Sequence, residues 1–352
     1  MENIQIIEFN PFKASDEELF VFADFINDTF REIEKDDPIP SREERVKNLK
    51  YKEPNLDEYL WLIWDSDKLI GFSEIGIKTK IAPNYEENKY IANYYIKLVK
   101  EYRRKGIGTE CLKKIITKAK ENGITVLQTH SLLNSGNEFC QKLNGILAIE
   151  SMENRCLMSD VNWELMEEWR KQGRERGEKE GRYLQWFEKC PEDIIEDYCN
   201  MYTETMNQQP LGEIEGRAKI TPESRRITEQ RFEKLGYIWH AVITREKDGK
   251  ISGVTDVTFI PDRPYKIYQE LTGVLMDYRG KGLGKWLKSE MLFFLRKKYP
   301  DVKYISTGNA NSNAPMLAIN IKMGFKPHLP IRNYKFYIND LENRIKEIEN
   351  QN

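Results

Sequence analysis

The chain has 352 residues, 39% of them hydrophobic and 11% aromatic, which is long enough and apolar enough for two ordinary domains. Its 55 basic and 57 acidic residues nearly cancel. This balance argues against a nucleic-acid-binding protein defined by bulk positive charge, so we expect no nucleic-acid partner.

The cysteines and histidines are few and scattered. Five cysteines include no CxxC pair, and the three histidines lie far apart, so we expect neither a disulfide framework nor a metal site. The N-terminus lacks the basic and apolar regions of a signal peptide, and no stretch approaches 18 uncharged apolar residues. We therefore expect no membrane span and a cytoplasmic location.

In the first half, β-rich runs at 59–64 and 69–77 flank the turn-forming residues 65–68, a pattern that predicts a hairpin. A further strand follows and leads into a glycine-containing segment at 103–108. A helix is expected next, because apolar residues recur at i, i+3, i+4 and i+7 (Leu112, Ile115, Ile116 and Ala119). A short strand at 124–129, a short helix and a last strand complete this half.

The second half repeats this order. Runs at 237–244 and 251–259 flank a turn at 247–250, and a strand leads into a second glycine-containing segment, followed by a helix with a similar apolar stripe. Arg103 and Arg279, which begin the two segments, lie 176 positions apart, half the length of the chain. We infer a duplication and expect an N-terminal domain at 1–160, a charged connecting segment at 161–189 and a C-terminal domain at 190–352.

The two glycine segments share the pattern Arg-x-x-Gly-x-Gly between a strand and a helix. The N–H groups and partial positive charge of a helix N-terminus hold phosphates, glycines let the backbone approach the anion, and the arginine adds charge-assisted hydrogen bonds. Neither copy has the Gly-Lys-Ser/Thr of a Walker loop or the third glycine of a dinucleotide fingerprint. The pattern therefore indicates a pyrophosphate ligand of another kind.

These segments resemble the acetyl-CoA motif of the GNAT N-acetyltransferase superfamily, and the overall plan is similar to tandem members such as mycothiol synthase. The resemblance implies an α/β (α+β) fold of two tandem GNAT acyl-CoA N-acyltransferase domains, each a mixed, mostly antiparallel sheet flanked by helices. It also implies acetyl-CoA as co-substrate. The implied cofactor-binding residues are Val274, Leu275, Arg279, Gly280, Lys281, Gly282, Leu283, Gly284, Asn313 and Asn320 in the second half, and Leu98, Val99, Arg103, Arg104, Lys105, Gly106, Ile107 and Gly108 in the first.

Direct acetyl transfer to an amine needs a base. We favour Glu270 in the strand before the second motif, with Asp256 on the adjoining strand as second choice; the alternative is that either carboxylate is solvated or paired with a cation. The tyrosine that many members place before the closing Gly-Phe is replaced by Asn320, which cannot act as an acid. Asn313 is expected to cap a helix, to bind pantetheine, or both.

The first half offers weaker chemistry. Tyr94 stands where the second half has Glu270, and Glu74 and His130 are its only plausible catalytic groups. We expect this half to bind CoA without turnover. The leading hypothesis is an N-acetyltransferase acting on a small-molecule amine or a peptide, as a monomer or homodimer. The alternatives are a non-catalytic acyl-CoA sensor or scaffold, and an O- or S-acyltransferase.

Overall fold

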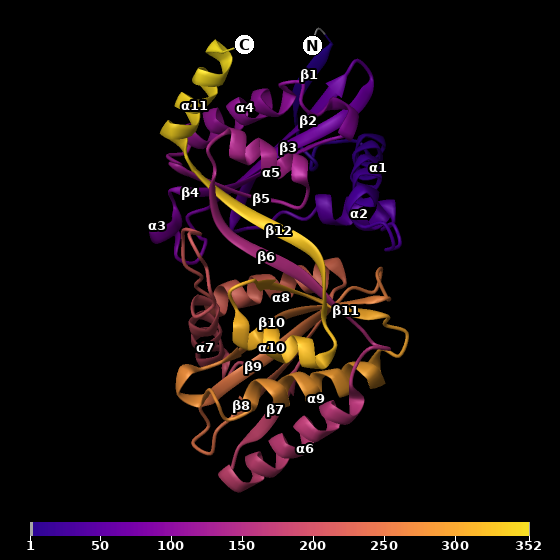
Figure 1. The fold of residues 1–352 in the computed structure, drawn as a ribbon, viewed down its shortest axis with the longest axis vertical. Coiled ribbons are helices and arrows are strands. Elements are labelled where there is room, and N and C mark those ends of the chain that lie inside the picture. Colours follow the sequence, from indigo (N-terminus) through magenta and orange to yellow (C-terminus); the bar gives the residue numbers. More distant parts are fainter. Residues whose placement is uncertain (1–2, 352) are drawn as a thin grey trace. The chain divides into compact units, whose positions relative to one another are not determined.

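The computed structural model describes residues 3–351, which form two compact units. Unit 1 comprises the residues up to Glu150, the short segment Gly212–Arg217 and the residues from Ile331 onward. Unit 2 comprises Ser151–Leu211 and Ala218–Pro330. Figure 1 labels the elements in chain order.

Unit 1 contains the elements of the first half and the end of the chain. They are β1 (Ile4–Phe9), α1 (Asp16–Ile33), α2 (Arg42–Leu49), β2 (Leu56–Asp65), β3 (Lys68–Lys78), α3 (Tyr85–Asn88), β4 (Ile91–Leu98), the 3₁₀ turn η1 (Lys100–Tyr102), α4 (Ile107–Glu121), β5 (Val126–Ser131), α5 (Asn134–Lys142), the start of β6 (Ile146–Leu157), the end of β12 (Lys326–Tyr337) and α11 (Ile338–Asn350).

Unit 2 contains the remainder of β6, the start of β12 and the elements between them. These are α6 (Trp163–Glu180), β7 (Tyr183–Phe187), α7 (Ile195–Asn207), α8 (Pro222–Leu235), β8 (Ile238–Arg245), β9 (Ile251–Phe259), β10 (Lys266–Val274), the 3₁₀ turn η2 (Met276–Tyr278), α9 (Leu283–Lys298), β11 (Tyr304–Ala310) and α10 (Ala314–Met323).

Helices cover both faces of the sheet of unit 1. Successive side chains of a strand point to opposite sides of the sheet, so neighbouring residues of one strand pack against different helices. On β2, Leu60 and Leu62 pack with Phe22 and Phe25 of α1. Trp61, between them, packs with the buried stripe of α4 and with α11. The stripe that the sequence predicts for this helix is buried as expected: Leu112, Ile115, Ile116 and Ala119.

Unit 2 has the same two helical layers. Ala241 and Ile243 of β8 pack with α7, whereas Val242 between them packs with α6 and α9. The sheets run in the order β1-β2-β3-β4-β5-β12 in unit 1 and β6-β11-β10-β9-β8-β7 in unit 2. The neighbouring pairs are antiparallel except for β4–β5 and β10–β11, which are parallel. The predicted fold, two mixed and mostly antiparallel sheets flanked by helices, is confirmed.

The units exchange their closing elements. The end of β12 pairs with β5 of the first half, and the second part of β6 pairs with β11 of the second half. The sequence leads one to expect contiguous domains, 1–160 and 190–352, whereas each compact unit contains a strand from the other half. The expected connecting segment 161–189 holds α6 and β7, both within unit 2. Propensity identifies strands, but the partner of a closing strand is decided by tertiary packing.

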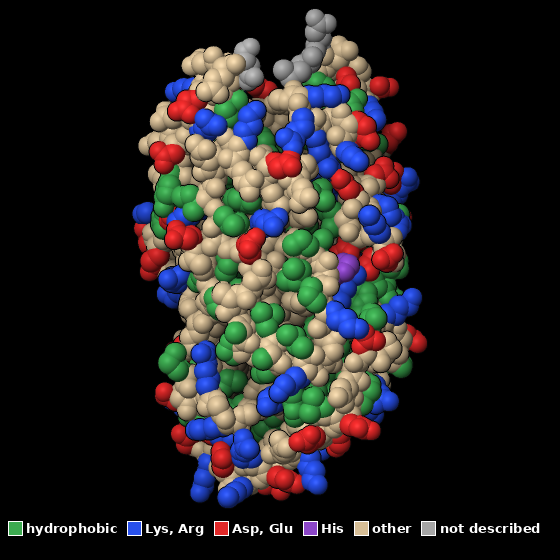
Figure 2. Space-filling view, viewed as in Figure 1, with side chains coloured by type: hydrophobic (Ala, Val, Ile, Leu, Met, Phe, Trp, Pro, Cys, Tyr) green, Lys and Arg blue, Asp and Glu red, His purple; other side chains and the backbone are tan. Residues whose placement is uncertain are grey.

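The surface is mixed in charge. Figure 2 shows lysine and arginine side chains interspersed with acidic ones on one face, as the near balance of charges leads one to expect. Among the described residues, no helix combines the length and apolar character needed to cross a membrane.

The exchanged helix α11 gives a stability prediction. Leu341 is 1% exposed and packs in the same cluster as Leu112 of α4. We expect Leu341→Ala to lower the free energy of unfolding by about 2–5 kcal/mol, because it leaves a cavity in the core of unit 1. Denaturant unfolding measures this, with the exposed Lys346→Ala on the same helix as control. Equal stability of the two variants would contradict a core role for α11.

Candidate functional site

A split between two parallel strands opens a cavity in unit 2. β10 and β11 pair only from Lys266–Tyr304 to Tyr268–Ser306, although the strands continue to Val274 and Ala310. Beyond the paired part lies a cavity of about 550 Å³ whose wall includes Thr272, Gly273 and Val274 of β10. The cavity therefore lies beside the unpaired carboxyl end of β10, and α10, which follows β11, contributes to its wall.

The predicted glycine motif forms one wall of this cavity. Gly280 and Gly282 have φ of 76° and 81°, a left-handed conformation that favours glycine. Gly282 is the N-cap of α9 and no side chain caps this helix, so N–H groups of its first turn are open to a ligand. Such a helix N-terminus at a cavity favours a bound anion.

The charged residues around this cavity are all basic. Among the described residues its wall contains four cationic side chains and no carboxylate (Arg176, Arg279, Lys281 and Lys285). Their positive charge attracts phosphate groups. The four cations, the left-handed glycine loop and the open N-terminus of α9 thus all fit the same kind of ligand, a pyrophosphate with an extended arm.

Unit 1 repeats this geometry with differences. β4 and β5 pair only as far as Asn93–Gln128, and a cavity of about 450 Å³ follows, lined by Gly106 and Gly108 of the first motif. Gly106 again has φ of 81°, but Arg104 adopts φ of 64° where unit 2 has a glycine. A left-handed arginine is an uncommon and mildly strained residue. Arg104 also pairs with Glu138, a carboxylate in the cavity wall.

The leading arginines of both motifs fold back onto the preceding strand. Arg103 donates from Nε to the Leu98 carbonyl at 2.9 Å, and Arg279 donates from Nε to the Val274 carbonyl at 3.1 Å. They differ in their second partner: Arg103 forms a two-point ion pair with Glu32 of α1, whereas Arg279 donates to the neutral amide of Gln208 after α7. The Arg103 guanidinium lowers the pKa of Glu32. Only the arginine of unit 2 therefore keeps its charge uncompensated.

A β-bulge distinguishes the strand of unit 2 before its motif. Gln269 pairs with Val257 and Thr272 pairs with Thr255, so Glu270 and Leu271 both stand opposite Asp256. In unit 1 the corresponding ladder runs without irregularity from Gly71–Leu98 to Ile77–Ala92. The bulge thus adds one residue to the ladder of unit 2 that the matching ladder of unit 1 lacks.

Asp256 holds this bulge in place. Its carboxylate accepts hydrogen bonds from the backbone N–H of Leu271 at 2.9 Å, from Trp239 Nε1 at 2.9 Å and from the Tyr202 hydroxyl at 3.2 Å. The side chain is 1% exposed. Burial raises the pKa of Asp256, and the hydrogen bonds from Trp239, Leu271 and Tyr202 oppose that rise. A carboxylate with three donors and no access to solvent is suited to positioning rather than to proton exchange with a substrate.

Glu270 lies on the bulge and its side chain reaches solvent, although protein surrounds much of it. Partial burial, reinforced by the negative Asp256, raises the pKa of Glu270 to about 7. Glu270 does not itself line the cavity; Thr272, two residues further along β10, does. A carboxyl that titrates near neutral pH is matched to the work of a general base.

The polar groups of unit 1 are arranged otherwise. Burial, with the nearby Glu58, raises the pKa of Glu74 to about 7, but no bulge accompanies this residue. His130 lines the cavity and packs against Tyr95 in a tilted arrangement with ring centroids 5.5 Å apart, and partial burial lowers the pKa of His130. Tyr94, which the spacing to the motif aligns with Glu270, is buried. Unit 1 therefore has a cavity and a glycine loop, but its carboxylate, Glu74, does not lie on a bulged strand.

Most of the predicted cofactor-binding residues line the cavities. In unit 2 the wall includes Val274, Arg279, Gly280, Lys281, Gly282, Leu283, Gly284 and Asn313; in unit 1 it includes Leu98, Arg103, Arg104, Gly106 and Gly108. The remainder lie outside the walls: Leu275, Asn320, Val99, Lys105 and Ile107.

Two asparagines that the sequence singles out take different places. Asn313 is the N-cap residue of α10, but its side chain makes no capping hydrogen bond, and it borders the cavity. Asn320 is 2% exposed and donates to Asn309 Oδ1 at 2.8 Å. The location of Asn320 therefore favours a structural role over contact with a cofactor.

Sequence reasoning missed the contribution of α6, which provides Trp169, Gln172, Gly173 and Arg176 to the cavity wall of unit 2. The charged composition of this segment suggested a linker. The four-residue spacing of Gly173 and Gly177 was the available signal, because small residues at that spacing allow two helices to approach closely.

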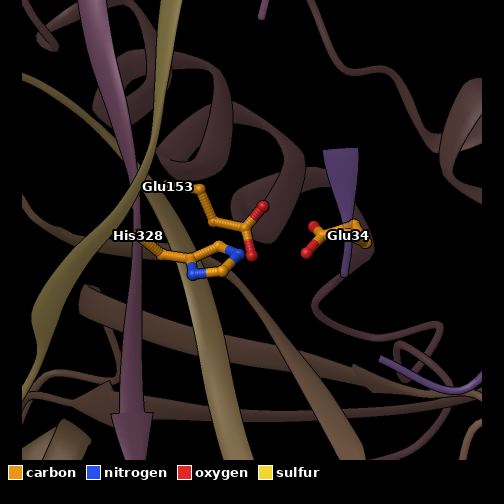
Figure 3. A group of neighbouring side chains, drawn as sticks. All are labelled: Glu34, Glu153 and His328. Atoms are coloured by element: carbon orange, nitrogen blue, oxygen red, sulfur yellow. The ribbon is translucent and has the colours of Figure 1, made fainter. Parts of the chain in front are cut away.

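No metal site is assigned in the described residues. Figure 3 labels Glu34, Glu153 and His328, of which only Glu153 and His328 belong to the same unit. Glu153 already pairs with Arg155 at 3.0 Å and with Lys266 at 3.6 Å. One carboxylate engaged by two cations beside one imidazole is a poor ligand set for a divalent ion.

The fold is shared with solved acetyltransferase structures. A tandem GNAT protein from the clavulanic acid biosynthesis pathway superimposes with a TM-score of 0.72 at 17% identity, over 95% of this chain and 98% of that one. A GCN5-related N-acetyltransferase from Sphaerobacter thermophilus gives 0.65 at 12% identity, over 96% of each chain. A glucosamine N-acetyltransferase region of a fungal β-N-acetylglucosaminidase gives 0.64 at 14%, over 95% of this chain and 38% of that one. At these identities the likeness concerns the fold.

The comparison with curated proteins gave no match. The model of the acetyltransferase (GNAT) family matches residues 23–144 and 163–325, well over half of the sequence and once in each half. Each match spans one strand–loop–helix motif, and the two cavities lie at those motifs. This chain therefore belongs to the GNAT acetyltransferase family and holds two GNAT domains in tandem.

Proposed function

We propose that the chain is an acetyl-CoA-dependent N-acetyltransferase whose working site is the cavity of unit 2, and that unit 1 binds CoA weakly and without turnover. Membership of the GNAT family supports acyl transfer in general. One observation carries the choice of unit 2: its cavity wall has four cations, no carboxylate among the described residues and an uncapped helix N-terminus, and it includes the end of the bulged strand that bears Glu270.

The residues of unit 2 fit the parts of CoA. The loop Gly280–Gly284 and the first turn of α9 would hold the pyrophosphate, and the gap beyond Thr272 would take the pantetheine arm. Acetyl-CoA supplies the activated acetyl thioester when bound. Asp256 holds the bulge, the bulge presents Glu270, and Glu270 accepts the proton that an ammonium acceptor must lose before its nitrogen can attack the thioester carbonyl.

The charge of Glu270 favours one class of acceptor. A carboxyl with a pKa near 7 is half ionised at neutral pH and attracts a cationic amine, which favours a small-molecule or peptide amine over a hydroxyl or thiol acceptor. We place the enzyme in the cytoplasm as a monomer or homodimer.

A non-catalytic acyl-CoA sensor is the second candidate, and Asn320 favours it. The residue stands where many family members place an acidic tyrosine, and it is buried against Asn309. A thiolate with a reference pKa near 8.5 is a tolerable leaving group without an acid, so turnover does not require that tyrosine. Activity with a panel of amines distinguishes the two candidates.

The first experiment is calorimetric titration with acetyl-CoA. We expect Arg279→Ala to weaken the tight site at least tenfold, about 1.4 kcal/mol, because the charge and the bond to Val274 are both lost. Arg103→Ala should leave that site unchanged. If both variants lose CoA affinity equally and the chain has two binding sites, the weak CoA binding proposed for unit 1 is contradicted. Absence of binding to the unaltered protein would overturn the proposal.

An exchange of the arginine partners tests why the units differ. Glu32→Gln gives Arg103 the neutral partner of unit 2, and Gln208→Glu gives Arg279 the acidic partner of unit 1. We expect CoA to bind unit 1 about five- to tenfold more tightly in the first variant, and unit 2 more weakly by a similar factor in the second. Calorimetry at low salt measures both. Unchanged affinities would show that neutralisation of the arginine is not the cause.

The pH dependence tests Glu270. Acetylation should rise with pH through about 7 as Glu270 ionises, and Glu270→Gln should remove this limb and slow the reaction by about 10²–10⁴-fold. The raised pKa also means that ionisation opposes folding. The wild-type protein should therefore lose stability relative to Glu270→Gln between about pH 4.5 and 7, with no further loss above. Parallel melting curves of the two proteins across this range would contradict the raised pKa.

A further inference from the structure

Helix α6 packs against α9 in unit 2 through two glycines that face Trp286. A Cβ at Gly173 would stand 2.2 Å from Trp286 Cγ, and one at Gly177 would stand 2.9 Å from Trp286 Cη2. No larger residue fits at either position without displacing the indole ring. The glycine pair therefore sets the separation of the two helices and brings the C-terminal part of α6 to the loop before α9.

The other arginines in and just after α6 are neutralised by carboxylates. Arg170 and Arg174 donate to Glu290 of α9 at 3.2 Å and 2.6 Å, and Arg182 donates to Glu246 at 2.6 Å. Arg176 differs: its recorded hydrogen bond within the described residues is to the backbone carbonyl of Lys281, at 2.6 Å. Its charge has no carboxylate partner among the ion pairs of this part of the chain.

Arg176 borders the cavity, and the motif leaves room for it. A Cβ at Gly282 would lie 3.2 Å from Arg176 Nη1, closer than most such contacts. Glycine at this position thus serves the left-handed turn and also the approach of the guanidinium. Arg176 completes the set of four cations in the cavity wall, and it is the member that comes from outside the strand, motif and following helix.

We propose that Arg176 of α6 is a phosphate-binding residue for CoA in unit 2, held in place by the fit of Gly173 and Gly177 against Trp286. This inference rests on the proposed CoA site. The guanidinium donates to Lys281 with one nitrogen and retains donors for a phosphate oxygen. The helix between the two repeats thereby becomes part of the cofactor site.

The helix at the matching place in unit 1 supports this assignment by contrast. α11 lies along α4, where Glu349 pairs with Lys113 and Glu342 pairs with Lys120. Its contribution to the cavity wall of unit 1 is the apolar Ile348. The helix beside the motif therefore brings a cation to the cavity in unit 2 and an aliphatic side chain in unit 1, which agrees with tighter phosphate binding in unit 2.

The test is calorimetry of the full chain with CoA and with 3′-dephospho-CoA at two salt concentrations. We expect Arg176→Gln to weaken CoA binding about five- to tenfold at the tight site, which is the one that Arg279→Ala weakens. It should also reduce the salt dependence of binding, because one cation no longer meets a phosphate. Arg176→Lys keeps the charge and should recover part of the affinity. A loss seen with CoA alone assigns the guanidinium to the 3′-phosphate, and a loss with both ligands assigns it to the pyrophosphate.

The matched control is Lys171→Gln, an exposed cation of α6 that pairs with Glu175 at 3.9 Å and does not line the cavity. It should bind both ligands as the unaltered protein does. The inference is overturned if Arg176→Gln binds CoA normally. It is also overturned if affinity falls while the salt dependence stays unchanged, since Arg176 would then only hold the Lys281 carbonyl. Failure of the unaltered protein to bind CoA would instead overturn the proposed function.

Discussion

Both cavities depend on the divergence of two parallel strands. Parallel pairing satisfies the backbone groups of β10 and β11 for three residue pairs and then ends, while the other edge of β10 remains paired with β9. The Thr307 hydroxyl bridges the start of the gap by donating to the Gln269 carbonyl at 3.4 Å. Beyond this point the backbone groups that face the gap have no strand partner, so a polar ligand can pair with them. The glycine loop and the helix N-terminus then supply the anion-binding end of the same gap.

The duplicated halves show how small changes separate a charged site from a neutralised one. The loop geometry is retained, with left-handed residues at the same two places of each motif. The surroundings of the motif differ. Arg103 lies beside a carboxylate, whereas Arg279 lies beside an amide. The strand before the motif is regular in unit 1 and bulged in unit 2. None of these changes alters the fold. Each changes the electrostatics or presentation of a group that would meet the ligand.

The sequence was most informative where local pattern decides the structure. The hairpins, the helix stripes and the glycine motifs appear where the periodicity and turn residues indicate, because each depends on neighbours within a few positions. The bulge at Glu270 was not foreseeable, since one extra residue in a strand leaves the alternation readable in either register. The roles of Glu32, Gln208 and Arg176 were equally hidden, because their partners lie 71 to 105 positions away in the chain.

The exchange of closing strands has a consequence for synthesis on the ribosome. β5 is complete at Ser131, whereas its partner strand reaches it through Arg332, about 200 residues later. At roughly 5–20 residues per second, the edge of β5 stays without this partner for roughly 10–40 s. During that interval the nascent first half carries an open strand edge, a known starting point for aggregation. The arrangement thus makes completion of the first domain wait for the second, and it places a demand on chaperones that a chain of two self-contained domains would not make.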